Sequence, residues 1–123
     1  MKLPFNTIDE IADAVHENAK NKGFHDPSES VDHFIIKHTN LLHEEVTELF
    51  SAHRNGKFNE PCDKADKMTA LGLKPLTCAE EEYADVVIRA FDQCRRLGID
   101  ILEAIQVKHA YNTTRPHLHG KRY

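Results

Sequence analysis

The chain has 123 residues, of which 40% are hydrophobic and 29% are charged, and its formal net charge is -4. This length suits one core, so we expect a single domain over residues 1–123. The negative charge argues against a nucleic-acid polymer as partner, because such binding usually needs a basic surface. No apolar run approaches the roughly 20 residues of a membrane-spanning helix, and the N-terminus lacks the apolar segment of a signal peptide. We therefore expect a cytoplasmic protein with no membrane partner.

The cysteines and histidines show none of the common metal-binding spacings. Cys62, Cys78 and Cys94 are far apart, so we expect free and mostly buried thiols. No two of the nine histidines are four residues apart on an expected helix, and no E-x-x-H occurs, which excludes metalloprotease and di-iron signatures. His38 falls on an apolar helix face, where we expect a core histidine or one near the site rather than a ligand.

Two helices are predicted in the first half of the chain. The first covers residues 5–22, because Thr7 and Glu10 form a capping box and Gly23 follows as a stop. The second and longer helix covers residues 31–53, between a capping serine and Asn55-Gly56.

Residues 57–76 interrupt the helical pattern with two prolines and a glycine. A short helix near residues 63–70 is compatible with the sequence. Such a long connection in a small domain is either a lid over a ligand or a passive surface segment, and the sequence favours neither.

Two more helices follow. The third should begin after the capping box of Thr77 and end near Leu97, with Glu82 and Asp85 on the side opposite its apolar face, where charged groups are usually solvated. The fourth begins after Asp100 and becomes polar or basic in its second half. Nothing alternates with strand periodicity, so the predicted fold is all-α, a bundle of four to five helices.

One acid on the long helix is out of place. At about 100° per residue, Glu45 lies at the centre of a stripe of apolar residues, and Glu48 lies at its edge. A carboxylate at a core position must be paired, hydrogen-bonded or bound to a metal. Glu45 and Glu48 are three residues apart, as are Glu82 and Asp85, so packing the two helices together would gather four carboxylates. Such a cluster suits Mg²⁺, which prefers oxygen ligands and often takes substrate phosphates.

These motifs resemble a known family. The sequence Glu44-Glu45-x-x-Glu48, followed by Glu82-x-x-Asp85, is similar to the EExxE…ExxD pattern of MazG-like, all-α nucleoside triphosphate pyrophosphohydrolases. The C-terminal stretch from Lys108 through His119-Gly120-Lys121 is similar to the end of small single-domain members. The resemblance covers roughly residues 30–123. The segment 57–76 is longer than its counterpart in compact members.

The resemblance implies hydrolysis of an NTP or dNTP to the monophosphate and pyrophosphate, by attack of a metal-activated water on the α-phosphorus. It implies Mg²⁺ as cofactor, for which Mn²⁺ can substitute, and assembly as a dimer or a dimer of dimers. The implied metal ligands are Glu45, Glu48, Glu82 and Asp85. The implied catalytic pair is Glu45 with Glu44, although a surface role suits Glu44 better. The implied substrate-binding residues are Lys108, Tyr111, Asn112, Arg115 and Lys121.

A second hypothesis involves no catalysis. The chain could be a helical module that dimerises through its apolar stripes, with Glu45 in a buried pair with a cation such as Lys108 or Arg115. The sequence leaves both hypotheses open, together with the base and sugar preference of an enzyme.

Overall fold

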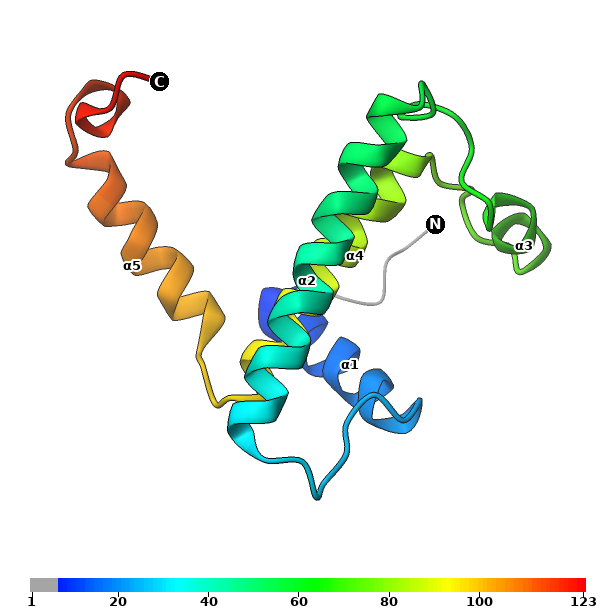
Figure 1. Cartoon of the computed structure of the whole chain (residues 1–123), viewed down its shortest axis with the longest axis horizontal. Coiled ribbons are helices and arrows are strands. Elements are labelled where there is room, and N and C mark those ends of the chain that lie inside the picture. The colour runs from blue at the N-terminus through cyan, green and yellow to red at the C-terminus, as the bar shows by residue number, and fades with distance from the viewer. Residues whose placement is uncertain (1–6) are drawn as a thin grey trace.

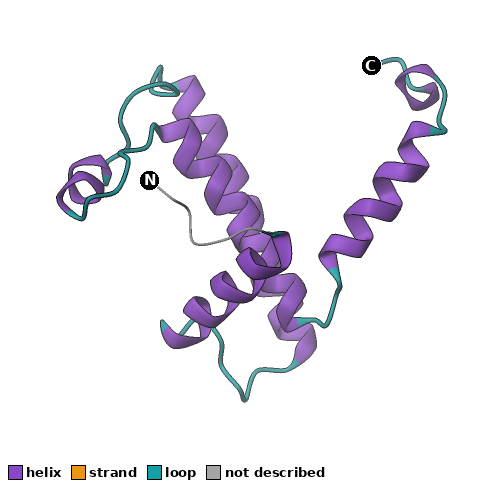
Figure 2. Ribbon diagram, turned by 180° about the vertical axis from the view of Figure 1, so that it is seen from behind, coloured by secondary structure: helices purple, strands orange, loops and turns teal. Residues whose placement is uncertain are grey.

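The computed structural model describes residues 7–123, and this part of the chain is all-α, as predicted. Five α-helices follow one another: α1 (Ile8–Asn21), α2 (Val31–Arg54), α3 (Ala65–Ala70), α4 (Cys78–Arg96) and α5 (Ile101–Thr113). A short 3₁₀ helix, η1 (His117–Gly120), follows α5 (Figures 1 and 2). No strand occurs between residues 7 and 123, where one isolated bridge pairs Pro61 with Thr77.

Local capping explains why the predicted helix boundaries are close to the observed ones. The side chains of Thr7, Ser30, Thr77 and Asp100 each accept a hydrogen bond from the backbone N–H three residues later. At Thr77 the capping box is complete, because Glu80 also accepts from the Thr77 backbone. The start predicted at residue 5 lies outside the described residues.

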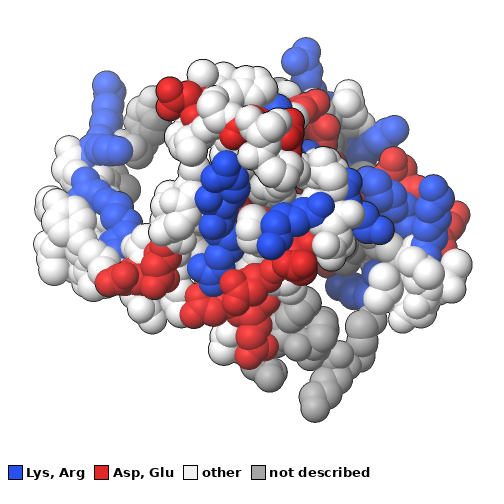
Figure 3. Space-filling view, turned by 90° about the horizontal axis from the view of Figure 1, so that it is seen from below, with Lys and Arg blue, Asp and Glu red and all other residues white. Residues whose placement is uncertain are grey.

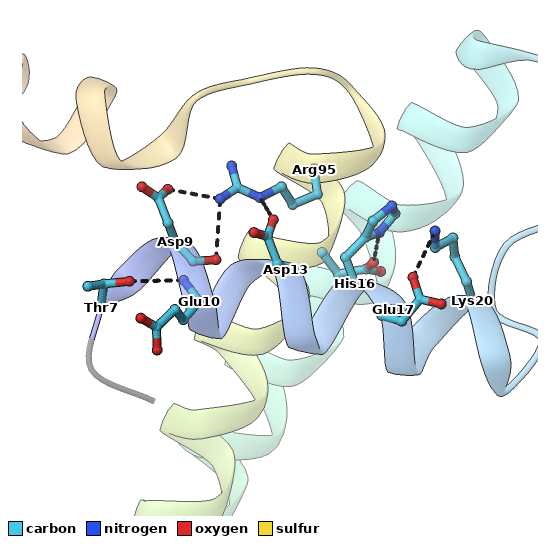
Figure 4. Close-up of polar contacts among 9 residues, drawn as sticks. Thr7, Asp9, Glu10, Asp13, His16, Glu17, Lys20 and Arg95 are labelled. Atoms are coloured by element: carbon cyan, nitrogen blue, oxygen red, sulfur yellow. Dashed lines mark hydrogen bonds and ion pairs between the residues drawn. The ribbon is translucent and has the colours of Figure 1, made fainter. Parts of the chain in front are cut away.

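The packed part of the molecule consists of α1, α2 and α4. Helices α2 and α4 run antiparallel and side by side along most of their length, and α1 packs across the lower end of α4 (Figure 1). Arg95 of α4 fastens α1 through Asp9 and Asp13, at 2.9 and 2.8 Å (Figure 4).

The side of α4 that faces α2 is the charged one, which contradicts our expectation of a solvated charged face. Glu81 and Asp92 are buried, and Glu82 and Asp85 are half-buried. Tyr83, on the predicted apolar face, is 57% exposed. The periodicity was right about which residues share a face, and wrong about which face the neighbouring helix covers.

The apolar core is thin for a chain of this length. Among the described residues its buried hydrophobic members are Ala12, Phe34, Cys62, Ala65 and Ala79. Many large apolar side chains remain exposed, among them Phe50 on α2 and Val107 on α5. Helix α5 stands apart from the other helices in both views (Figures 1 and 2).

The surface carries charges of both signs. On the face shown in Figure 3, acidic side chains gather in a band across the middle, and Lys and Arg side chains border it. In residues 7–123 no helix combines the length and the apolar character needed to cross a bilayer.

Truncating Phe34 should be costly, because it is 2% exposed and lies between the His38 ring and the Arg96 guanidinium. We expect Phe34→Ala to lower the free energy of unfolding by about 3–5 kcal/mol, measured by urea denaturation. Leu71→Ala is the control: Leu71 is 75% exposed, so its truncation should change stability by less than about 0.5 kcal/mol. Equal effects of the two changes would contradict this core assignment.

Candidate functional site

Carboxylates from α2 and α4 meet where the two helices face each other. Glu45 and Glu48 on α2 and Glu82 on α4 each place a carboxylate oxygen within 4.8 Å of the others. Asp85, one turn after Glu82 on α4, interacts electrostatically with Glu45. The structure thus brings three of the four acids that the sequence singled out into one cluster and places Asp85 beside it, because each helix presents its pair at i and i+3.

The crowding of these acids changes their protonation. Burial and the neighbouring Glu48 raise the pKa of the Glu82 carboxyl to about 7. The pKa of Glu48 is also raised, by burial and by Glu45, and that of Asp85 by burial and by Glu45. Without a bound cation, Glu82 therefore keeps its proton to a higher pH than an isolated carboxyl group does.

Glu45 has a cationic partner that the sequence did not identify. The Arg89 Nε donates to Glu45 Oε1 at 2.6 Å, and Glu45 is 8% exposed. The partners that we expected for a buried pair were Lys108, which lies on α5, and Arg115, which lies just after it. In the described residues no hydrogen bond or ion pair joins either of them to α2. A charge-assisted bond to Arg89 makes the burial of Glu45 tolerable in the absence of a metal.

A second cation lies at the edge of the cluster. Lys64, in the segment between α2 and α4, donates to the buried Glu81, and this contact raises the pKa of the Lys64 ammonium. Lys64 also interacts electrostatically with Asp85. The segment 57–76 therefore supplies a charge beside the cluster. Its α3 confirms the short helix expected near residues 63–70.

The donor set suits a hard divalent cation. All the oxygens of the cluster come from carboxylates, and Glu82 Oε2 is buried with no hydrogen-bond partner. A divalent ion would give this carboxylate oxygen a partner and would lower the raised pKa values of the neighbouring carboxyl groups. Mg²⁺ or Mn²⁺ fits this set better than zinc, which usually takes nitrogen or sulfur ligands.

A cavity of about 450 Å³ adjoins the cluster. It is lined by Glu45, Asp85 and Arg89, and also by His38 and Asp92. Its remaining walls are mostly apolar and come from α1, the following connection and α4: Ala14, Val15, Asn18, Ala19, Phe24 and Ile88. This size and composition are typical of small-molecule pockets.

The predicted substrate-binding residues lie elsewhere in the single chain. Lys108, Tyr111 and Asn112 are on α5, Arg115 lies just after it, and Lys121 follows η1. The Lys108 Nζ and the Arg115 Cζ lie 5.0 and 5.6 Å from the centre of the Tyr111 ring. This cationic group is thus assembled at the C-terminal end of α5, but the chain does not fold it onto its own carboxylates. Glu44 is exposed and is not among the three converging acids.

The sequence contained a signal that the charged side of α4 is the packed side. Glu81, Asp85, Ile88 and Asp92 follow the i, i+4, i+7, i+11 spacing of a packed helix stripe. Arg89 follows Asp85 by four residues on that side. Three acids in such a stripe suggest burial opposite a charged partner, but the apolar residues on the other side of α4 outweighed them in our prediction.

No match was found when the chain was compared with models of protein families, with curated protein sequences and with solved structures.

The raised pKa of Glu82 predicts a pH-dependent stability of the metal-free protein. The folded state holds this proton more tightly than the unfolded state does, so the contribution is fully present below about pH 4.5 and is lost as the pH rises through about 7. In EDTA, Glu82→Gln should therefore make the fall in the free energy of unfolding between pH 5 and pH 8 shallower. Glu17→Gln is the control, because Glu17 is exposed beside Lys20. If the pH dependence of the free energy of unfolding were the same in Glu82→Gln as in the wild type, the raised pKa of Glu82 would be contradicted.

Proposed function

We propose that the protein is a Mg²⁺-dependent nucleoside triphosphate pyrophosphohydrolase of the MazG-like type. It would convert an NTP or dNTP and water into the nucleoside monophosphate and pyrophosphate. The observation that carries the proposal is the convergence of Glu45, Glu48 and Glu82 from α2 and α4, with Asp85 interacting electrostatically with Glu45, beside a cavity of about 450 Å³. The resemblance of these motifs to the family supports the same assignment.

Charge alone shows why an ion is needed. A triphosphate is an anion, and Glu45, Glu48, Glu82 and Asp85 would repel it unless divalent cations lay between them. On this proposal the four acids hold Mg²⁺, or Mn²⁺ in its place. When bound, the ion would supply positive charge to the phosphate oxygens and favour ionisation of a water.

The residues around the cluster have distinct parts in this proposal. Arg89 holds Glu45 in its buried position before the ion arrives, at the 2.6 Å contact described above. The apolar walls of the cavity bury the nucleoside end of the substrate, since such surfaces favour the faces of a base or sugar over water. Glu44 is exposed and interacts electrostatically with Glu48, and on this proposal it would orient a water from the surface.

The proposal includes a dimer or a dimer of dimers. A compact monomer of 14.1 kDa is expected to expose about 6,700 Å², whereas this chain exposes 9285 Å². The excess falls in the range of surface that stable homodimers bury. Exposed apolar side chains on both packed helices, including Val46, Phe50 and Val87, provide a face for a second copy.

The same dimer would complete the site. Lys108 on the separate helix α5 and Arg115 just after it both lie beside Tyr111, while the carboxylate cluster needs phosphate-binding cations near it. Delivery of α5 to the cluster of the partner would bring these complementary charges together. Asn112 and Lys121 would lie with them as further phosphate or sugar contacts.

The alternative is a non-catalytic helical module, and the Arg89–Glu45 pair is the observation that favours it. A buried charge pair needs no metal, and the exposed apolar faces serve dimerisation under either hypothesis. Thermal unfolding separates the two. A metal site predicts that Mg²⁺ raises the Tm relative to EDTA, whereas a module that relies on Arg89 predicts no change.

The catalytic proposal predicts release of pyrophosphate, and not orthophosphate, from a panel of NTPs and dNTPs with Mg²⁺. Glu48→Gln and Asp85→Asn should each lower kcat by more than about 100-fold. Asp85→Asn should also stabilise the metal-free protein, since it removes one of the repelling acids. Glu17→Gln, far from the cluster on α1, should retain full activity. Full pyrophosphate release by Glu48→Gln at saturating Mg²⁺ would refute the assignment.

Mixing two inactive variants tests the shared site. If Lys108 serves the cluster of its partner, a mixed dimer of Glu48→Gln and Lys108→Ala has one intact site. Statistical mixing should then restore about a quarter of the wild-type activity. If Lys108 serves its own chain, every site keeps one defect and no activity returns. Each variant mixed with itself is the control.

A further inference from the structure

Two histidines and an aspartate converge from three separate segments, away from the carboxylate cluster. His16 lies on α1, His25 lies in the connection between α1 and α2, and Asp92 lies on α4. The His16 Nδ1 and the His25 Nε2 are each 2.8 Å from Asp92 Oδ1. Figure 4 shows His16 reaching from α1 toward α4, where a dashed line marks its contact with this carboxylate.

The spacing of these atoms is close to that of a metal's ligands. The His16, His25 and Asp92 ligand atoms all lie within 4.8 Å of one another. Bonds of about 2.0–2.1 Å in tetrahedral geometry place ligands roughly 3.3 Å apart. Each histidine would therefore have to move from Asp92 by only about half an ångström to admit an ion.

The charge of the Asp92 carboxylate is compensated when one of the histidines is protonated or when a cation is bound. The Asp92 side chain is 10% exposed, and among residues 7–123 its ion-pair partners are the two histidines alone. Neutral imidazoles can donate hydrogen bonds to a carboxylate but do not offset its charge, and a buried charge is costly unless it is compensated. A divalent cation between the three side chains would supply that compensation.

Two further buried nitrogens lack partners beside this group. His25 Nδ1 and His38 Nε2 are both buried and make no hydrogen bond. The His38 ring is 5.7 Å from the His25 ring, and burial lowers the pKa of His38, which therefore stays neutral. A neutral imidazole has a lone pair to offer, so His38 is available as an additional donor near the ion.

The donors also differ in kind from those of the carboxylate cluster. Imidazole nitrogens favour first-row transition metals over Mg²⁺, and zinc commonly takes two histidines with a carboxylate. Asp92 also lines the cavity of about 450 Å³, which gives an ion a path from solvent and leaves room for a water in an open position.

We propose that His16, His25 and Asp92 form a binding site for one transition-metal ion, Zn²⁺ by ligand chemistry, that clamps α1 and the following connection onto α4. The site is separate from the Mg²⁺ site and does not depend on the proposed hydrolase activity. It connects segments that are far apart in the sequence, so the ion acts first on the stability of the helical unit.

The test uses the full chain, freed of metals with a chelator and dialysed. Titration with Zn²⁺ in calorimetry should give one tight equivalent per chain, and a hundredfold excess over Kd should raise the Tm by roughly 5–15 °C. Co²⁺ should give the visible absorption of a low-symmetry site with nitrogen ligands. His16→Gln and His25→Gln should each weaken Zn²⁺ binding on the order of 100-fold.

Two controls separate this site from other metal binding. His109→Gln, on the exposed face of α5, should retain the tight equivalent, as should Glu45→Gln in the carboxylate cluster. If His25→Gln fails to fold, two measurements still test the proposal: the Co²⁺ spectrum of the wild type, and Zn²⁺ binding by His16→Gln. The proposal is overturned if the wild-type chain binds no Zn²⁺ tightly, or if His16→Gln binds it as the wild type does.

Discussion

Helices α2 and α4 are held together at a contact rich in acids, and each buried acid there must be met by a positive charge or a proton. Arg89 meets Glu45, Lys64 meets Glu81, and two histidines meet Asp92. Glu82 has no basic partner in these ion pairs, and burial together with the neighbouring Glu48 raises its pKa to about 7. Of these pairs, Arg89–Glu45 is the one that joins α4 to α2, and a shift of one helix turn would separate it, so this buried pair helps to specify the register of the two helices.

The helices were predictable from the sequence because their ends are set locally. Capping side chains such as Thr77 and Asp100 act on backbone groups three residues away, so no tertiary information is needed. The misplaced Glu45 was likewise visible, since periodicity around one helix is also local. The orientation of α4 was not predictable in this way. A helical wheel separates two faces, but it does not say whether the apolar face meets a helix of the same chain or remains exposed, as Tyr83 does.

In the candidate site, too, the features set by local spacing were predictable and those set by tertiary packing were not. The i, i+3 spacing of the acids predicted the cluster, because it fixes which side chains project together. The partners Arg89 and Lys64 depend on how distant segments pack, and the meeting of His16 with His25 and Asp92 joins residues up to 76 positions apart. The C-terminal cations were identified as a group but not placed, since no periodicity reveals that α5 leaves the helical unit.

The isolated bridge between Pro61 and Thr77 has a further consequence. Backbone hydrogen bonds from Cys62 to Leu76 and from Cys78 to Glu60, both 2.9 Å, hold the two ends of the intervening segment together. The segment that carries α3 is therefore a closed lobe, whose ends stay fixed whatever lies between them. Because loop closure entropy grows only slowly with length, residues can be gained or lost in this lobe at little cost. Variation there can change the charges beside the carboxylate cluster, to which Lys64 contributes, while the contact between α2 and α4 keeps its geometry.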